Sequence, residues 1–273
     1  MPFAWKAKNT SDRIRSWAKL GAVLFVVLSI ALYDTLNLAN IGNHILINLL
    51  PVIAAAFTAV MATLVWERFE RAETPRRVWR YFAVGLWSWV IAELIWGGLD
   101  IAWGEVTVSG ADIFWVAGYI FFTHALFIQY RLLSSPSRRE LWVRILVAVV
   151  VLGLLYSLVY HLLVTWLGAE SQLVAAINSF YPVADVFLAG IAIGLVRQFG
   201  GGAFARPWLG LLAFAFTDLL YAVVEASERY AWNVNLVDVF DLAYFGAYLI
   251  LGLGILSQWV FLKYGLRSPT QPQ

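Results

Sequence analysis

One stretch of the sequence decides the class of this protein. Residues 78–103 read VWRYFAVGLWSWVIAELIWGGLDIAW, in which only Arg80, Glu93 and Asp100 carry a charge. An α-helix rises about 1.5 Å per residue, so about 20 apolar residues cross the hydrocarbon core of a bilayer. The stretch is long and apolar enough to do so, and it predicts a transmembrane helix.

The composition of the whole chain also indicates a membrane protein. Of its 273 residues, 62% are hydrophobic and 13% are charged, whereas soluble domains are about 45–50% apolar and about 25% charged. The net charge is only +2 and the basic residues are scattered, which argues against nucleic acid as a partner. The chain has no cysteine, so disulfides and thiolate metal sites are excluded. No catalytic motif occurs, so enzymatic activity finds little support and any cofactor is unknown.

Eight segments of the chain are long and apolar enough to cross a bilayer. They cover residues 18–38, 43–66, 78–103, 110–133, 141–168, 172–198, 206–228 and 236–263. The loops between them are short, so we expect an all-α bundle of eight transmembrane helices in one domain, residues 18–263. Residues 1–17 are basic and amphipathic, which is typical of an interfacial helix or of a frayed basic tail. Residues 264–273 form a short cytoplasmic tail.

The distribution of basic residues predicts the orientation of these spans. Lysine and arginine accumulate in cytoplasmic loops. With both termini cytoplasmic, every lysine and arginine except Arg229 falls at the cytoplasmic side. We therefore expect a multi-pass protein of the plasma (inner) membrane, with both termini in the cytoplasm and the lipid bilayer as its first partner.

Two pairs of carboxylates suggest an internal repeat. Glu93 and Asp100 stand seven residues apart in the third span, as do Asp218 and Glu225 in the seventh, and an aromatic residue follows the first acid of each pair by three positions. Seven residues are close to two helical turns, so both acids of a pair project from one face. We interpret the bundle as built of parallel helical-hairpin repeats, in each of which the next span carries further acids and tyrosines.

The acids and tyrosines of those following spans complete the candidate set. They are Asp112 and Tyr119 in the fourth span, Tyr181 and Asp185 in the sixth, and Asp238, Asp241 and Tyr244 in the eighth. Pro182 predicts a kink or a shortened helix in the sixth span. The three histidines, His44, His124 and His161, are expected at separate positions, so we expect no metal site.

The depth of the acids suggests a function for them. Counted from the basic ends of their spans, Glu93, Asp185 and Asp218 lie near the midplane, where a carboxylate costs roughly 2.5 to 3.5 kcal/mol. We therefore expect these acids to face one another inside the bundle, where they are protonated, hydrogen-bonded or bound to a cation. The alternative is structural: hydrogen bonds between helices, with Asp112 and Asp238 as helix N-caps.

The motifs around these acids resemble a known family. The run SGADIFWVAGY at 109–119, the Tyr181-Pro182-x-x-Asp185 motif and the Asp238…Tyr244 motif are similar to the multi-helix membrane sensor region at the N-terminus of bacterial diguanylate cyclases and sensor histidine kinases. The resemblance covers about residues 78–260 and implies perception of a membrane or periplasmic cue. No cyclase or kinase domain follows the last span here, so the resemblance implies that a separate signalling protein on the cytoplasmic side receives the output.

Three functions remain open from the sequence. The first is a stand-alone sensor or receptor-like module that binds a small ligand or cation in an acid-lined, outward-facing cavity within the membrane. The second is a proton- or cation-coupled transporter that uses Glu93, Asp185 and Asp218 as a relay. The third is a membrane subunit that binds pigment, lipid or quinone, which the 16% aromatic content favours.

Overall fold

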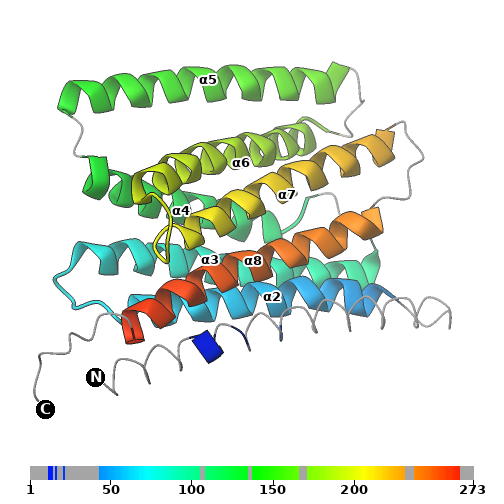
Figure 1. Ribbon diagram of the computed structural model, residues 1–273. Coiled ribbons are helices and arrows are strands. Elements are labelled where there is room, and N and C mark those ends of the chain that lie inside the picture. The colour runs from blue at the N-terminus through cyan, green and yellow to red at the C-terminus, as the bar shows by residue number, and fades with distance from the viewer. Residues whose placement is uncertain are drawn as a thin grey trace, which may run out of the picture.

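The fold is a bundle of long helices, seen in the computed structural model of Figure 1. The structure describes residues 12–14, 16, 21, 43–104, 108–134, 137–165, 171–230 and 237–264. The long helices are α2 (Asn43–Trp66), α3 (Thr74–Trp103), α4 (Ala111–Ser134), α5 (Arg138–Thr165), α6 (Gln172–Phe199), α7 (Arg206–Tyr230) and α8 (Val237–Tyr264). No strand occurs among the described residues. All of these helices except α7 are long and apolar enough, over the described residues, to cross a membrane, as expected of a multi-pass membrane protein.

The helices begin and end close to the predicted bounds, because local capping signals set their ends. Thr74 begins α3 four residues before the predicted span, with Pro75 in the first turn, where proline is favoured. Ser137 and Glu140 form a capping box that starts α5: each side chain accepts the backbone N–H of the other, at 3.2 and 3.1 Å. The predicted first span, 18–38, lies outside the described residues apart from Gly21, as does most of the N-terminal segment 1–17.

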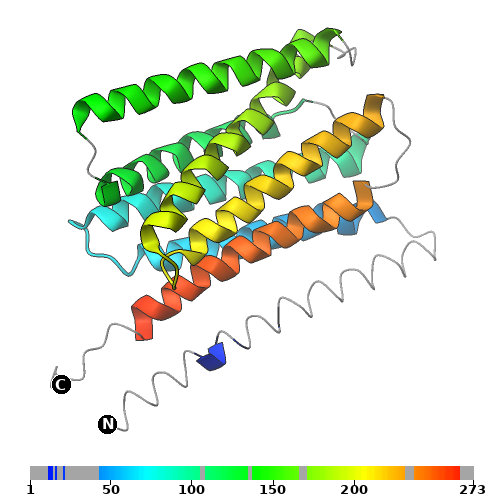
Figure 2. The same cartoon turned by 45° about the horizontal axis from the view of Figure 1, so that its top comes forward.

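The order of the described helices in space follows their order in the chain except at α5, since α4 packs directly against α6. In both views α5 lies along one edge of the bundle, and α2 and α8 lie at the opposite side (Figures 1 and 2). α3 packs between α2 and α4, α7 packs between α6 and α8, and α2 packs against α8, whereas among the described helices the backbone of α5 lies close only to that of α6, and its Arg144 side chain also contacts Tyr130 of α4. The helices from the two ends of the described chain therefore enclose one interior, whereas most of the α5 side chains are exposed over the described residues.

Aromatic side chains fill this interior. The largest fully buried side chains include Trp79, Trp89, Trp208, Tyr248, Phe82, Phe122, Phe214 and Phe245. They come from α3, α4, α7 and α8 and lie in one continuous core. Because the lipid is as apolar as these rings, close van der Waals packing rather than transfer from water holds such a core together.

Two glycines let the backbones of α7 and α8 touch. A Cβ atom on Gly254 of α8 would lie 2.5 Å from the carbonyl oxygen of Arg206, and one on Gly210 of α7 would lie 2.7 Å from the Cα of Leu251. Both contacts are with backbone, which cannot rotate away as a side chain can. The packing of α7 on α8 therefore depends on the absence of a side chain at these two positions.

The first prediction concerns this close contact. Gly254→Ala is expected to destabilise the protein by about 1 to 3 kcal/mol, because overpacking forces the two helices apart. Gly246→Ala is the matched control on the same helix, since none of the described residues lies within 4 Å of its Cβ position, and alanine favours a helix by up to about 1 kcal/mol. Thermal unfolding in detergent measures both. Equal thermal unfolding midpoints for Gly254→Ala and Gly246→Ala would contradict the close approach of the α7 and α8 backbones.

Candidate functional site

A tyrosine joins two carboxyl groups from two other helices in the interior. The Tyr119 hydroxyl of α4 lies 2.7 Å from Asp185 Oδ1 of α6 and 3.0 Å from Asp218 Oδ2 of α7. Tyr119 and Asp185 are buried, at 4% and 1% exposure, and Asp218 is half-buried. These three residues tie α4, α6 and α7 together in the part of the bundle where the sequence places the deepest acids.

The third deep acid has two tyrosine partners. Glu93 of α3 is buried, and its Oε1 accepts hydrogen bonds from the hydroxyls of Tyr244 and Tyr248, both at 2.9 Å. The two hydroxyls, one turn apart on α8, are 3.3 Å from each other. Asp218 also interacts electrostatically with both Glu93 and Asp185. The two groups of hydrogen bonds therefore form one network, which we call the carboxyl–tyrosine network: Glu93, Tyr119, Asp185, Asp218, Tyr244 and Tyr248.

The single proton of the Tyr119 hydroxyl limits how its two carboxyl contacts can form. A tyrosine hydroxyl has one proton to donate, yet the Tyr119 oxygen lies within hydrogen-bond distance of two carboxyl oxygens. Both contacts are full hydrogen bonds only when one of the two carboxyls carries a proton and donates it. Asp185 Oδ2 is buried and has no hydrogen-bond partner among the described residues. The arrangement of one hydroxyl between two carboxyls is therefore satisfied when the two carboxyls together carry one proton.

The network joins two helix pairs, α3–α4 and α7–α8, by two equivalent contacts. Tyr119 of the α3–α4 pair contacts Asp218 of the α7–α8 pair, and Tyr244 of the α7–α8 pair contacts Glu93 of the α3–α4 pair. The same number of residues separates Glu93 from Asp218 as separates Tyr119 from Tyr244. Each helix pair thus places a tyrosine on the acid of the other pair.

The Asp112 carboxylate accepts hydrogen bonds both from the start of α4 and from the neighbouring helix α6. Its Oδ2 accepts the backbone N–H of Ser109 at 2.7 Å, while the Ser109 hydroxyl accepts the N–H of Ala111 at 3.1 Å. Its Oδ1 accepts the hydroxyl of Tyr181 of α6 at 2.5 Å. The capping interpretation therefore needs a correction: Ser109 is the N-cap, and Asp112 completes a capping box while it also binds a neighbouring helix.

The remaining candidates lie apart from the network or outside the described side chains. Asp100 is buried at the other end of α3, where its Oδ2 accepts the side-chain N–H of Asn48 of α2 at 2.7 Å. The side chains of Glu225, Asp238 and Asp241 lie outside the described residues. Asp100 thus contacts α2, whereas Glu93 on the same helix contacts α8.

Sequence reasoning missed two partners in the interior. Tyr248 was not among the candidates, although it follows Tyr244 by four residues, a spacing that puts both on one helix face. Asn48 gives no comparable signal, because its role depends on the packing of α2 against α3. Of the two outcomes predicted at Pro182, a kink or a shortened helix, the second is wrong, because α6 continues from Gln172 to Phe199 through the proline; the kink stays a prediction.

The fold and the network define an all-helical, multi-pass membrane protein with hydrogen-bonded acids in its interior. No family model, no curated protein and no solved structure matches this chain. Among the described residues, no group of three histidine, aspartate or glutamate side chains could hold a metal ion. The function must therefore be argued from the network itself.

Proposed function

We propose that this protein is a membrane sensor module whose stimulus is ionic and whose chemical event is the gain or loss of a proton in the carboxyl–tyrosine network. The observation that carries the proposal is the position of the Tyr119 hydroxyl between Asp185 and Asp218, at 2.7 and 3.0 Å. A proton is the one cation that such a contact can take up or release without first opening space. A second proton would neutralise the remaining carboxylate and change which oxygens donate and accept.

Because the network joins five helices, a change in its protonation would move these helices relative to one another. Its members come from α3, α4, α6, α7 and α8, and both hydrogen bonds of the Tyr119 hydroxyl cross between helices. In a low-dielectric interior the strength of these hydrogen bonds depends strongly on charge. Protonation therefore biases the packing of several helices at once, which is what a sensor requires.

The proposal includes the architecture that the sequence predicts. It comprises eight spans, both termini in the cytoplasm, parallel hairpin repeats and a separate cytoplasmic signalling protein as the receiver. The reciprocal pairing of Tyr119 with Asp218 and of Tyr244 with Glu93 supports the repeats, since two related hairpins packed about a common axis exchange equivalent contacts. The resemblance to the membrane region of bacterial cyclases and kinases supports the sensing role.

A distance measurement tests the proposal, and the second prediction is its result. The chain has no native cysteine, so Leu133→Cys on α4 and Gln198→Cys on α6 introduce two spin labels at exposed positions. In lipid nanodiscs, the distance between the labels is expected to change between about pH 9 and about pH 4, a range wide enough for buried carboxyls. The change is expected to disappear when Asp185→Asn and Asp218→Asn are added.

The controls separate sensing from general effects of acid. Glu140→Gln removes an exposed carboxylate from the start of α5 and is expected to leave the pH response intact. A distance that is the same at both pH values, or a response that survives the double substitution at Asp185 and Asp218, would overturn the proposal.

A proton-coupled transporter is the second candidate, because the Asp185–Tyr119–Asp218 contact joins two acids through a group able to pass a proton between them. Transport predicts proton flux into proteoliposomes, reported by an enclosed pH-sensitive dye and lost with Asp218→Asn. A sensor gives the pH-dependent distance change without flux. The two measurements on the same preparations therefore distinguish the candidates.

A further inference from the structure

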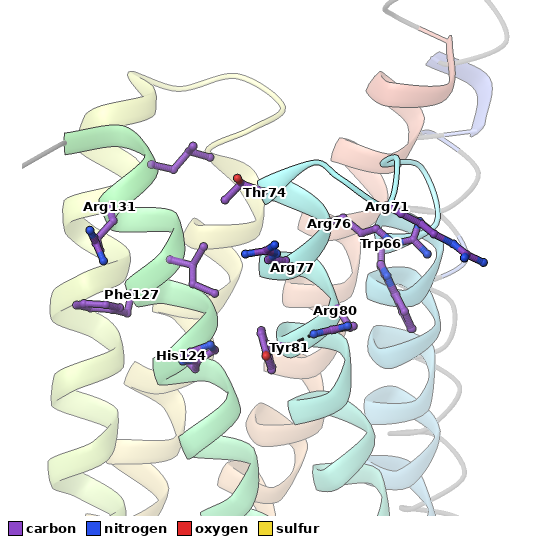
Figure 3. Close-up of a pocket in the computed structure, with 12 residues that line it drawn as sticks. Trp66, Arg71, Thr74, Arg76, Arg77, Arg80, Tyr81, His124, Phe127 and Arg131 are labelled. Carbon is purple, nitrogen blue, oxygen red and sulfur yellow. Dashed lines mark hydrogen bonds between the residues drawn. The ribbon is translucent and has the colours of Figure 1, made fainter.

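A basic pocket lies at the end of the bundle where α3 begins and α4 ends (Figure 3). Its volume is about 990 Å³, and twelve described residues line it. The basic side chains among them are Arg71, Arg76, Arg77, Arg80, Arg131 and His124. None of the twelve is acidic. The carboxyl–tyrosine network uses no residue of this pocket, so the pocket is a separate candidate site.

The contacts of these arginines hold their guanidinium groups without neutralising them. The Arg76 guanidinium donates to the carbonyl oxygen of Phe69 at 2.6 Å and lies 5.7 Å from the ring centroid of Trp66. Arg80 lies 5.1 Å from the ring centroid of Tyr81, and Arg131 lies 5.9 Å from that of Phe127. A carbonyl oxygen and aromatic rings carry no net charge, so the positive charge of the pocket is kept.

The nearby acids are used elsewhere. In the turn before α3, Glu67, Glu70 and Glu73 are exposed and none of them lines the pocket; Glu73 Oε2 accepts the backbone N–H of Glu70 at 2.7 Å, and Glu140 belongs to the capping box of α5. Glu73, at the N-cap position of α3, makes no side-chain cap hydrogen bond, and Thr74, the first residue of α3, lines the pocket. The positive end of the α3 dipole therefore adds to the field of the arginines.

The shape of the pocket combines a polar end with an apolar flank. In Figure 3, Arg77 lies between α3 and α4, nearer the end of the bundle than Tyr81 and His124, and Arg131 lies at a similar level on the other side of the α4 ribbon, with Phe127 below it. Below them the Tyr81 and His124 rings meet edge to face at 4.4 Å. Trp66, Phe127, Ile128 and Leu132 complete the lining. The pocket thus suits a ligand with an anionic group and a hydrocarbon part.

We propose that this pocket binds the phosphate headgroup of an anionic phospholipid, with an acyl chain along the exposed apolar side of α4. Guanidinium groups match phosphate oxygens with paired hydrogen bonds, and basic pockets between transmembrane helices bind anionic headgroups. The helices that form the pocket are long and apolar enough to cross a membrane, so their ends lie at the level of the headgroups. Free phosphate has no part that would use the four apolar lining residues.

The third prediction is the result of a lipid-binding experiment. Native mass spectrometry of the full chain in detergent, titrated with phosphatidylglycerol or phosphatidylcholine, is expected to show preferential retention of phosphatidylglycerol. Arg77→Gln combined with Arg131→Gln is expected to lower that retention by about 10- to 30-fold, since an arginine near a phosphate contributes about a factor of five. Retention of phosphatidylglycerol by Arg77→Lys combined with Arg131→Lys should lie between that of the wild-type chain and that of the glutamine variant, because charge remains while paired hydrogen bonding is lost.

The matched control removes the same charge elsewhere. Arg138→Gln combined with Arg139→Gln changes two exposed arginines at the start of α5, outside the pocket, and is expected to retain phosphatidylglycerol as the wild-type chain does. Equal losses in the two double variants, or no preference over phosphatidylcholine, would overturn the proposal. Displacement of the lipid by an equal concentration of inorganic phosphate would also overturn it, since the pocket would then take the free anion. Unfolding midpoints in phosphatidylcholine verify that each variant is folded.

Discussion

Trp89→Ala is expected to cost about 3 to 5 kcal/mol of unfolding free energy, the largest effect of any single substitution considered for this protein. Trp89 of α3 is 1% exposed. Its ring centroid lies 4.7 Å from that of Phe122, 5.0 Å from Phe214 and 5.1 Å from Tyr119. The indole therefore contacts rings of both helix pairs, and no small rearrangement of one helix could fill the space it leaves.

The surroundings of Trp89 show why the space would stay empty. A Cβ atom on Gly118 would lie 2.3 Å from the indole ring, so the ring occupies the volume above that glycine. The indole N–H donates to the carbonyl oxygen of Trp115 at 3.0 Å. Truncation would remove this hydrogen bond and open a cavity lined by the partners of the indole, whose lost contacts account for most of the cost.

An exposed tryptophan provides the comparison with the buried Trp89. Trp142 of α5 is 60% exposed, and Trp142→Ala is expected to change the unfolding free energy by less than about 1 kcal/mol. Unfolding by a denaturing detergent, followed by circular dichroism, measures both variants. A similar small loss for both would contradict the central position of Trp89.

The helices could be predicted from the sequence because each carries its own signals. The apolar run at 172–198 matches α6, Gln172–Phe199, and the capping residues next to it are local: the Ser171 hydroxyl accepts the N–H of Val174 at 3.2 Å. The burial of Glu93 and Asp185 follows from position alone, since a carboxylate deep in a span is costly anywhere except the interior.

Which side chains meet could not be predicted, because it depends on the order of the helices in space. Nothing in the sequence indicates that α6 packs against α4 as well as against α7, and this arrangement accompanies the meeting of Asp185 and Asp218 at Tyr119. The basic pocket could not be predicted from the sequence for the same reason. In the sequence its arginines act as orientation signals in separate loops, and their convergence depends on the packing of α3 against α4.

Tyr119→Phe is expected to lower the unfolding free energy by about 2 to 4 kcal/mol, although it removes a single oxygen atom. The hydroxyl contacts Asp185 at 2.7 Å and Asp218 at 3.0 Å, and the phenyl ring would keep the aromatic packing. Its loss deprives two acidic groups of a partner: an unsatisfied buried group costs about 1 to 3 kcal/mol, and the half-buried Asp218 lies at the low end of that range. Tyr156→Phe is the control, because the Tyr156 hydroxyl makes one long contact, 3.3 Å, with the carbonyl oxygen of Ala176.

A double-mutant cycle connects this stability effect to the proposed function. If Tyr119 holds a proton-sharing pair, Tyr119→Phe and Asp185→Asn should not be additive, with a coupling energy of about 1 to 3 kcal/mol. The pH-dependent distance between the labelled ends of α4 and α6 should also disappear in Tyr119→Phe, since the hydroxyl is the link between those helices. Additive energies together with an intact pH response would mean that the hydroxyl only fills space, and the sensing proposal would then lose its central observation.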